Sequence, residues 1–165
     1  MSELLSVQKT AILGFGNPVR SDDGIGVHVA NRLMLELKDR NDISVFDMGT
    51  SAFEVLFKLK EHQRLIIIDA VRDSGEPDGT LFSLPASAIK AEIQDDPMVF
   101  LHGMKWDQAL SYASKIMGDE FPEDNIQVYL VAISDFRMSL GMSVTLEKAS
   151  EELVATIMSD LNRLL

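Results

Sequence analysis

Apolar and polar residues alternate along this chain in a pattern that predicts strands and helices in turn. Four short, nearly continuous apolar runs predict strands covered on both faces, and they span residues 10–15, 43–47, 64–70 and 127–133. A fifth run, over 80–84, is shorter and predicts an edge strand. Buried strands therefore alternate with longer connecting segments.

The connecting segments carry apolar residues at spacings of three and four, which places those residues along one side of a helix. A last helix is expected over 145–164, with Ser143 as its N-cap. The expected buried positions of the four helices are, in chain order, Val27, Ala30, Leu33, Met34 and Leu37; Phe53, Leu56 and Phe57; Trp106, Leu110, Ala113 and Met117; and Leu146, Ala149, Leu153, Ile157 and Leu161.

This alternation predicts an α/β fold, a three-layer sandwich in which a mainly parallel sheet of about five strands is flanked by helices. The length of 165 residues fits a single domain over 1–165 that buries its own core. In such sheets the ligand crevice lies outside the carboxyl ends of the strands. Candidate site residues are therefore sought just after each strand.

Composition excludes several classes of function. The formal net charge of -11 disfavours binding to nucleic acid and to anionic membrane surfaces. The chain has no Cys, so disulfides, thiolate zinc sites and a Cys nucleophile are excluded, and any metal must be held by His, Asp or Glu. No signal peptide and no apolar run of roughly 20 residues occurs, so we expect a cytoplasmic protein.

Four carboxylates fall at or just beyond the ends of predicted strands. Asp69 is the most informative, because it follows four apolar residues, a context in which an ionised group needs a specific partner. It is either a site residue or a carboxylate that caps nearby backbone N–H groups. Asp47, before Met48-Gly49-Thr50, is interpreted as mainly structural, in a tight strand-to-helix turn.

The other two carboxylates, Asp22 and Asp23, belong to the stretch GFGNPVRSDDGIG. Either can cap the helix that is expected to begin near Gly24 and gain from its dipole. One cap is needed, so one carboxylate is left for another task. Asp22 is the better candidate for the cap, and Asp23 for a ligand.

Three histidines occur, and two have ordinary explanations. His28 lies within the first predicted helix, and His62 lies near the end of the second, where a cation is favoured. His102 lies in an expected loop, where binding groups concentrate. Asp23, Asp69 and His102 together would offer two carboxylates and one imidazole, a set that suits nickel, zinc or iron and leaves coordination positions open.

These residues resemble those of the endopeptidases that mature [NiFe] hydrogenases by trimming the C-terminal tail of the large subunit. The resemblance covers nearly the whole chain and rests on four features. They are G-x-G-N-x-x-x-x-D-[DE]-x-x-G at 14–26, D-x-G-T at 47–50, the strand end at 67–70, and His102. No single piece is specific, but the ordered set is.

The resemblance implies a twisted sheet between helices, of the phosphorylase/hydrolase-like type. It also implies that Asp23, Asp69 and His102 are both the metal-recognising and the catalytic residues. The enzyme would inspect nickel carried by its partner, the hydrogenase large-subunit precursor, and cut the nearby peptide bond; another divalent metal is possible in the free enzyme. Two places depart from the family: the neighbours of His102, and residues 132–137, where many members have a Gly-x-x-Pro-like turn.

Two other functions are weighed against this one. A nickel-binding assembly factor would use the same three residues without cutting. A nucleotide-binding module would use Gly14 and Gly16, but Val19 replaces the small third residue of the dinucleotide motif, and two carboxylates would repel a pyrophosphate. A serine protease lacks support, because the sequence has no G-x-S-x-G elbow.

Overall fold

The computed structural model describes residues 9–52, 54–89 and 105–164. A single sheet runs through the molecule, and its strands lie at or within two residues of the predicted positions. They are β1 (Thr10–Phe15), β2 (Ile43–Gly49), β3 (Arg64–Arg72), β4 (Leu81–Pro85) and β5 (Ile126–Ile133).

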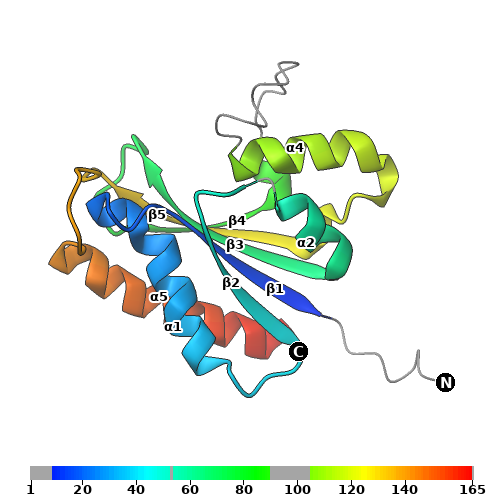
Figure 1. Ribbon diagram of the computed structural model, residues 1–165, viewed down its shortest axis with the longest axis horizontal. Coiled ribbons are helices and arrows are strands. Elements are labelled where there is room, and N and C mark those ends of the chain that lie inside the picture. Colours follow the sequence, from blue (N-terminus) through cyan, green and yellow to red (C-terminus); the bar gives the residue numbers. More distant parts are fainter. Residues whose placement is uncertain (1–8, 53, 90–104, 165) are drawn as a thin grey trace.

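The strand order is β2-β1-β3-β5-β4, which places β1 and β3 side by side within the sheet (Figure 1). The four longer strands pair in parallel, whereas β4 lies antiparallel to β5 at an edge. The mainly parallel sheet and the edge position of the fifth predicted strand are therefore confirmed. Because β1 and β3 are parallel neighbours, their carboxyl ends open at the same place.

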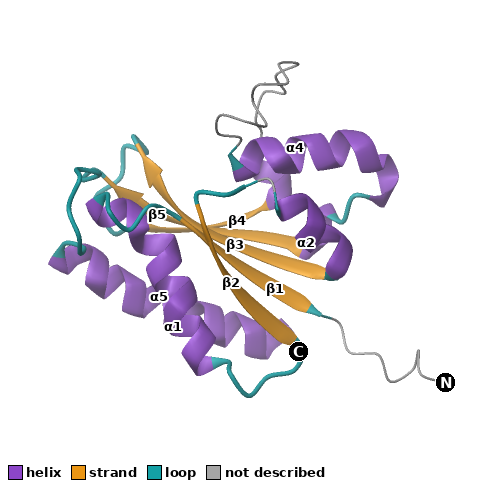
Figure 2. Cartoon of the chain, in the orientation of Figure 1, coloured by secondary structure: helices purple, strands orange, loops and turns teal. Residues whose placement is uncertain are grey.

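Helices cover both faces of the sheet, so the predicted three layers are confirmed (Figure 2). One face packs against α1 and α5, and the other against α2 and α4. The helices are α1 (Ile25–Glu36), α2 (Val55–Glu61), α4 (Trp106–Met117) and α5 (Val144–Leu164). Short 3-10 turns are η2 (Ser21–Gly24), η3 (Ala86–Ala88), η4 (Gly118–Glu120) and η5 (Glu123–Asn125).

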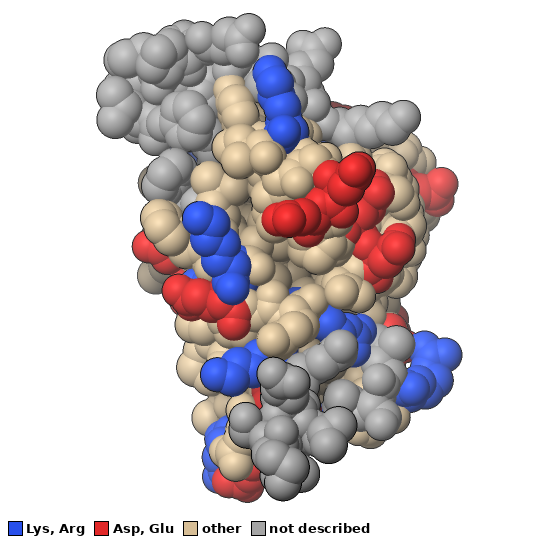
Figure 3. All heavy atoms as spheres, turned by 90° about the vertical axis from the view of Figure 1, so that its right-hand side faces the viewer, with Lys and Arg blue, Asp and Glu red and all other residues tan. Residues whose placement is uncertain are grey.

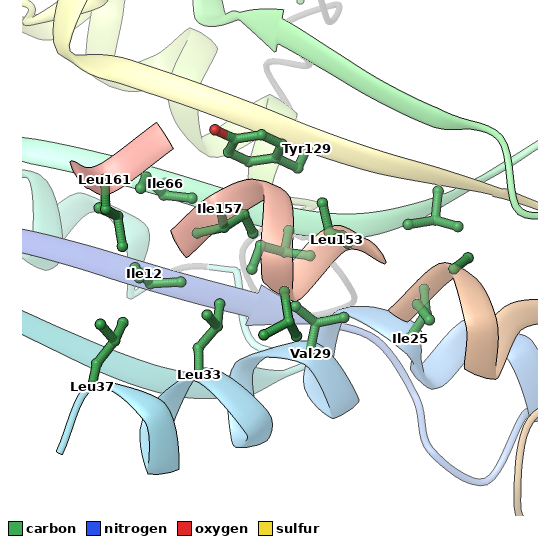
Figure 4. Close-up of a cluster of buried hydrophobic side chains, with 14 of the residues drawn as sticks. Ile12, Ile25, Val29, Leu33, Leu37, Ile66, Tyr129, Leu153, Ile157 and Leu161 are labelled. Atoms are coloured by element: carbon green, nitrogen blue, oxygen red, sulfur yellow. The ribbon is translucent and has the colours of Figure 1, made fainter. Parts of the chain in front are cut away.

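The core under α1 and α5 follows the predicted stripes closely (Figure 4). All five positions expected for the last helix, Leu146, Ala149, Leu153, Ile157 and Leu161, are buried against the sheet. The Ser143 Oγ accepts a hydrogen bond from the Leu146 N–H at 3.3 Å, which confirms Ser143 as the N-cap of α5.

Two predicted helix faces are partly wrong. Met34 was expected in the core, but it is 42% exposed, and Val29 occupies the buried side of α1 instead. On α2, Phe57 is 51% exposed, whereas Val55 and Leu59 are buried. The seven residues of α2 make only two turns, so a rotation of one position changes which side chains face the sheet. The third expected position, Phe53, lies outside the described residues.

None of the helices in the described ranges is both long and apolar enough to span a bilayer. Figure 3 views the molecule from the side at which β1 and β2 begin. Acidic and basic side chains are interspersed on that face, and its described residues form no continuous basic patch.

Candidate active site

Glycines in the opening motif bring α1 against the ends of two strands. Gly16 has φ of 151°, and a Cβ there would lie 2.3 Å from the Asp23 carbonyl oxygen. A Cβ on Gly26 would lie 2.1 Å from the Phe15 carbonyl oxygen and 2.6 Å from that of Ile68. Only glycine allows these approaches. The motif therefore places η2 and the start of α1 over the carboxyl ends of β1 and β3.

The carboxylate of Asp23 lies against the backbone of the opening loop. The Asn17 N–H donates to Asp23 Oδ2 at 3.1 Å, and the Asp23 side chain is partly buried. A backbone donor of the loop is thus already used by an acidic side chain. This arrangement disfavours an anionic ligand and favours a cation beside Asp23.

Asp22 does not cap α1, so that prediction is wrong. No side chain caps α1, which follows directly from η2. Asp22 is only 1% exposed, and its carboxylate accepts hydrogen bonds from the Ser143 N–H at 2.8 Å and from the Ser143 Oγ at 3.0 Å. The turn of η2 directs Asp22 toward the N-terminus of α5, where a negative charge is also favoured. Asp22 therefore has a structural role other than the predicted one, and the ligand role of Asp23 stays a prediction.

Asp69 lies in the carboxyl half of β3 and is held by two donors. The Trp106 Nε1–H donates to its Oδ2 at 2.8 Å, and the Ala70 N–H donates to its Oδ1 at 2.7 Å. The bond from Ala70 confirms that Asp69 accepts a nearby backbone N–H, which is one of the two interpretations from the sequence, whereas its role as a site residue stays a prediction.

The pKa of Asp69 is raised from its ordinary 3.8 to about 7, chiefly because burial disfavours the charged carboxylate. The negative charge of Asp23 raises it further. The hydrogen bonds from Trp106 and Ala70, and the positive charge of Lys105, act in the opposite direction. Near neutral pH the Asp69 carboxyl is therefore about half protonated, and a cation beside it would favour its ionised form.

Trp106 is the site residue that sequence analysis missed. It was assigned to the buried stripe of α4, and it is indeed 8% exposed and lies 6.5 Å from the Phe15 ring, centroid to centroid. Its indole N–H, however, reaches Asp69 across 37 positions of sequence. The only signal was that a buried tryptophan N–H needs an acceptor.

The remaining candidates from the sequence lie elsewhere. The exposed Asp47 accepts the Gly49 N–H at 3.0 Å, which fits the structural role predicted for it. His28 lies on α1 with its pKa lowered by burial and then by Arg32, and His62 ends α2 with its Nδ1 3.1 Å from the Lys58 carbonyl oxygen. His102 lies outside the described residues. Among the residues that are described, no cluster of three or more His, Asp or Glu is positioned to hold a metal.

A hollow of about 400 Å³ lies at the opposite end of the sheet, beside the first residues of β3 and β5. It contains Tyr129, whose hydroxyl donates to Asp160 Oδ2 at 2.6 Å, and whose pKa is raised by burial and by that bond. Arg163 pairs with the same Asp160 carboxylate. Neither Asp23 nor Asp69 lines this hollow, so it is separate from the carboxylate pair.

Comparison with known proteins gives a consistent result. Residues 27–160 match the family model described as hydrogenase maturation protease. The HupD hydrogenase expression/formation protein of Thiocapsa roseopersicina is 28% identical over 131 residues, which are 78% of this chain and 58% of that protein. The hydrogenase 2 maturation protease of Escherichia coli is 29% identical over 80 residues, 48% of this chain and 49% of that protein. The matches span between 34% and 58% of the HupD proteins.

Solved structures show the same fold. The hydrogenase maturating endopeptidase HybD from E. coli superposes with a TM-score of 0.73 at 22% identity, covering 94% of this chain and 93% of that one. The [NiFe] hydrogenase maturation protease HycI from Thermococcus kodakarensis gives a TM-score of 0.71 at 22% identity, with the same coverage. These likenesses extend over nearly the whole sheet and its helices.

Proposed function

This chain belongs to the hydrogenase maturation protease family, and from that premise we propose that it is an endopeptidase that removes the C-terminal extension of a [NiFe] hydrogenase large-subunit precursor after nickel insertion. The proposed substrate is the nickel-loaded precursor, and the proposed compartment is the cytoplasm. The observation that carries the proposal is the placement of Asp23 in η2, which follows β1, and of Asp69 in the carboxyl half of the neighbouring β3, with the pKa of Asp69 raised to about 7.

The pair is suited to recognise a cation that arrives with the substrate. A carboxylate next to another carboxylate in a partly buried site is costly to ionise, and an approaching metal ion reverses that cost. Nickel held by thiolates of the precursor would complete its coordination with Asp23 and Asp69. A precursor without nickel would offer no such compensation and would bind weakly.

His102 is the proposed third ligand. It precedes Trp106 by four residues, and a chain segment of that length spans at most about 14 Å. Trp106 donates to Asp69, and a connection of only four residues is the reason for choosing His102 as the proposed third ligand. The site would then have the two carboxylates and one imidazole that suit nickel.

The reaction requires a water molecule activated beside the scissile bond. Nickel in the precursor would polarise the carbonyl group, and either Asp23 or Asp69 would accept the proton of the attacking water. Trp106 would hold the Asp69 carboxylate in one orientation through its indole N–H. Asp23, Asp69 and His102 are therefore assigned both recognition and catalysis.

A processing assay tests this proposal. Purified protein is incubated with candidate precursors, with and without nickel, and the precursor mass is measured. We expect a shortened C-terminus only with nickel, and loss of cutting by at least about 100-fold in Asp23→Asn, Asp69→Asn and His102→Ala. Asp119→Asn is the matched control, because Asp119 is an exposed aspartate in η4.

The outcomes separate the proposal from its alternatives. Full activity in the Asp69 or His102 variant would remove that residue from the site. Equal cutting with and without nickel would exclude nickel inspection. A precursor that forms a complex with the protein but stays uncut in every case would identify an assembly factor rather than a protease.

A further inference from the structure

Exposed apolar residues are concentrated in the opening loop and in the segment from the end of β5 to the start of α5, which are hydrogen-bonded to each other. Of the nine large apolar side chains that are exposed in the described part of the chain, five belong to these two segments. We call these five the apolar rim, and it consists of Val19, Phe136, Met138, Leu140 and Val144, which are 43%, 42%, 69%, 80% and 76% exposed. Scattered exposed apolar residues are ordinary, whereas a contiguous group marks an interaction site.

Backbone hydrogen bonds hold the two halves of the rim together. The segment after β5 forms a parallel bridge with the opening loop at Arg20 and Ser139. The Ser139 N–H donates to the Val19 carbonyl oxygen at 2.9 Å, and the Ser21 N–H donates to the Ser139 carbonyl oxygen at 2.9 Å. Figure 1 shows this segment, in orange, beside the blue opening loop. The rim is therefore preformed, which lowers the cost of binding.

The rim continues into the proposed active site. Val19 lies between Asn17, whose N–H binds Asp23, and Asp22, whose carboxylate binds Ser143. Val144 directly follows Ser143 as the first residue of α5. A polypeptide that crosses the rim is thus led toward the carboxylate pair at the ends of β1 and β3.

Two arginines, Arg20 and Arg72, lie at the rim. The Arg72 guanidinium lies 4.5 Å from the centre of the Phe136 ring, and Arg20 flanks Val19 in the bridge. Within the described ranges, neither arginine forms an ion pair. Because the chain carries a net charge of -11, unpaired cations beside an apolar surface indicate a partner that brings carboxylates.

We propose that the apolar rim is the docking surface for the hydrogenase large-subunit precursor, and that it receives a segment whose apolar side chains are flanked by carboxylates. This inference rests on the proposed function and deepens it, because it assigns selection of the precursor to a surface outside the carboxylate pair. Residues 132–137, where the sequence departs from the family, supply Phe136 of the rim. The rim would therefore set which hydrogenase this chain serves.

The test introduces charge at the rim without disturbing the core. In Met138→Asp and Leu140→Asp we expect the affinity for nickel-loaded precursor to fall about tenfold or more, because an apolar contact is replaced by a desolvated carboxylate. KM should rise by the same factor while kcat stays near that of the unchanged protein. Arg72→Glu should also weaken binding, and its effect should shrink at high salt.

Leu35→Asp on α1 and Ile116→Asp on α4 are the matched controls, since these side chains are 70% and 77% exposed and lie outside the rim. They should leave binding and KM unchanged. Thermal melts of all variants check that folding is preserved. Binding is also measured directly by calorimetry, so the rim is tested even with a precursor that is not cut.

Failure of the two proposals is distinguishable. A protein that binds the precursor through the rim but never cuts it contradicts the proposed protease activity and supports the rim. A protein that cuts, and whose rim variants bind and cut like the controls, overturns the rim. A second copy of this chain is the other candidate occupant of the rim, and sedimentation of the unchanged protein and of Leu140→Asp tests for it. Self-association that is lost in Leu140→Asp, while precursor binding is retained, would also overturn the proposal.

Discussion

At the scale of single residues, Asp69 shows a conflict between stability and function. Its carboxylate is retained in an environment that raises its pKa from 3.8 to about 7. A group whose pKa is higher in the folded protein stabilises the fold fully below its ordinary pKa, and that contribution is lost as pH rises through the folded pKa. The free energy of unfolding should therefore fall between about pH 4 and pH 7 because of Asp69.

Asp69→Asn removes this titration. The side-chain amide of Asn has one acceptor oxygen instead of two, so the variant loses the hydrogen bond from either Trp106 or Ala70. We therefore expect it to be slightly less stable than the unchanged protein near pH 4. Toward about pH 8 the difference should shift in favour of the variant by up to ~4 kcal/mol, because the pKa of about 7 already includes the effect of the two donors. Urea unfolding at several pH values measures this. A difference that does not change with pH would contradict the assigned pKa.

The role of a residue could be predicted from the sequence where its partner is near in sequence or is the sheet itself. Asp69 stood out because an acid after four apolar residues needs a partner. Its actual donor, Trp106, is 37 positions away, and the partner of Asp22, Ser143, is 121 positions away. Such pairings depend on which elements the fold brings together, and a single sequence carries no record of them.

At the scale of elements, strands were predicted better than helix faces. A strand covered on both sides needs only a continuous apolar run, so β1, β3 and β5 were located to within two residues. A helix face depends on rotation about the helix axis, and two turns of α2 fix that rotation poorly. The long α5 offered five buried positions in register, and all five were correct.

Because α1 lies close to the sheet, the stability change that we predict for Gly26→Ala is opposite in sign to the change expected from helix propensity alone. Gly26→Ala should gain up to ~1 kcal/mol by propensity alone. We expect instead a loss of ~3 kcal/mol or more, because the added Cβ would lie 2.1 Å and 2.6 Å from backbone oxygens of β1 and β3, so that α1 or the strands would have to shift. Thermal or urea unfolding measures the change.

Gly75→Ala is the matched control for this variant. Gly75 has φ of 82°, and a Cβ added there would meet no atom within 4 Å, so only backbone strain of ~1 kcal/mol is expected. A Gly26 variant as stable as the Gly75 variant would show that α1 does not need close approach to the strands. In that case the glycines of the opening motif would need another explanation.

At the scale of the whole molecule, the described residues that are assigned to function lie near the carboxyl ends of the strands. The opening loop, the end of β3, the start of α4 and the segment before α5 meet there, although they are spread over most of the chain. The sequence predicted this location because parallel sheets bind ligands at that edge. It did not predict the apolar rim, since exposed apolar residues in a connecting segment look like any loop until the bridge at Arg20 and Ser139 aligns them.

The hydrogen bonds between Asp22 and Ser143 join η2 to the N-terminus of α5, and their contribution to stability can be measured. Asp22 is 1% exposed and accepts two hydrogen bonds from Ser143, so Asp22→Ala should lower the free energy of unfolding by ~2–3 kcal/mol. Ser143→Ala should cost ~1 kcal/mol as a lost cap and side-chain donor. In the double variant the two losses should sum to more than the measured change, because the shared bond is removed only once.

The same variants connect these hydrogen bonds to the proposed site. If Asp22 keeps the opening loop in place, its loss should also weaken precursor binding, because Val19 of the rim and Asn17, which binds Asp23, belong to that loop. Asp119→Ala, at an exposed aspartate in η4, should change neither stability nor binding appreciably. Strictly additive losses in the double-variant cycle, with unchanged binding, would mean that the two segments hold their positions independently. Losses of stability that are coupled in the double variant, together with weaker binding, would instead show that the hydrogen bonds between Asp22 and Ser143 help to form the surface that selects the precursor.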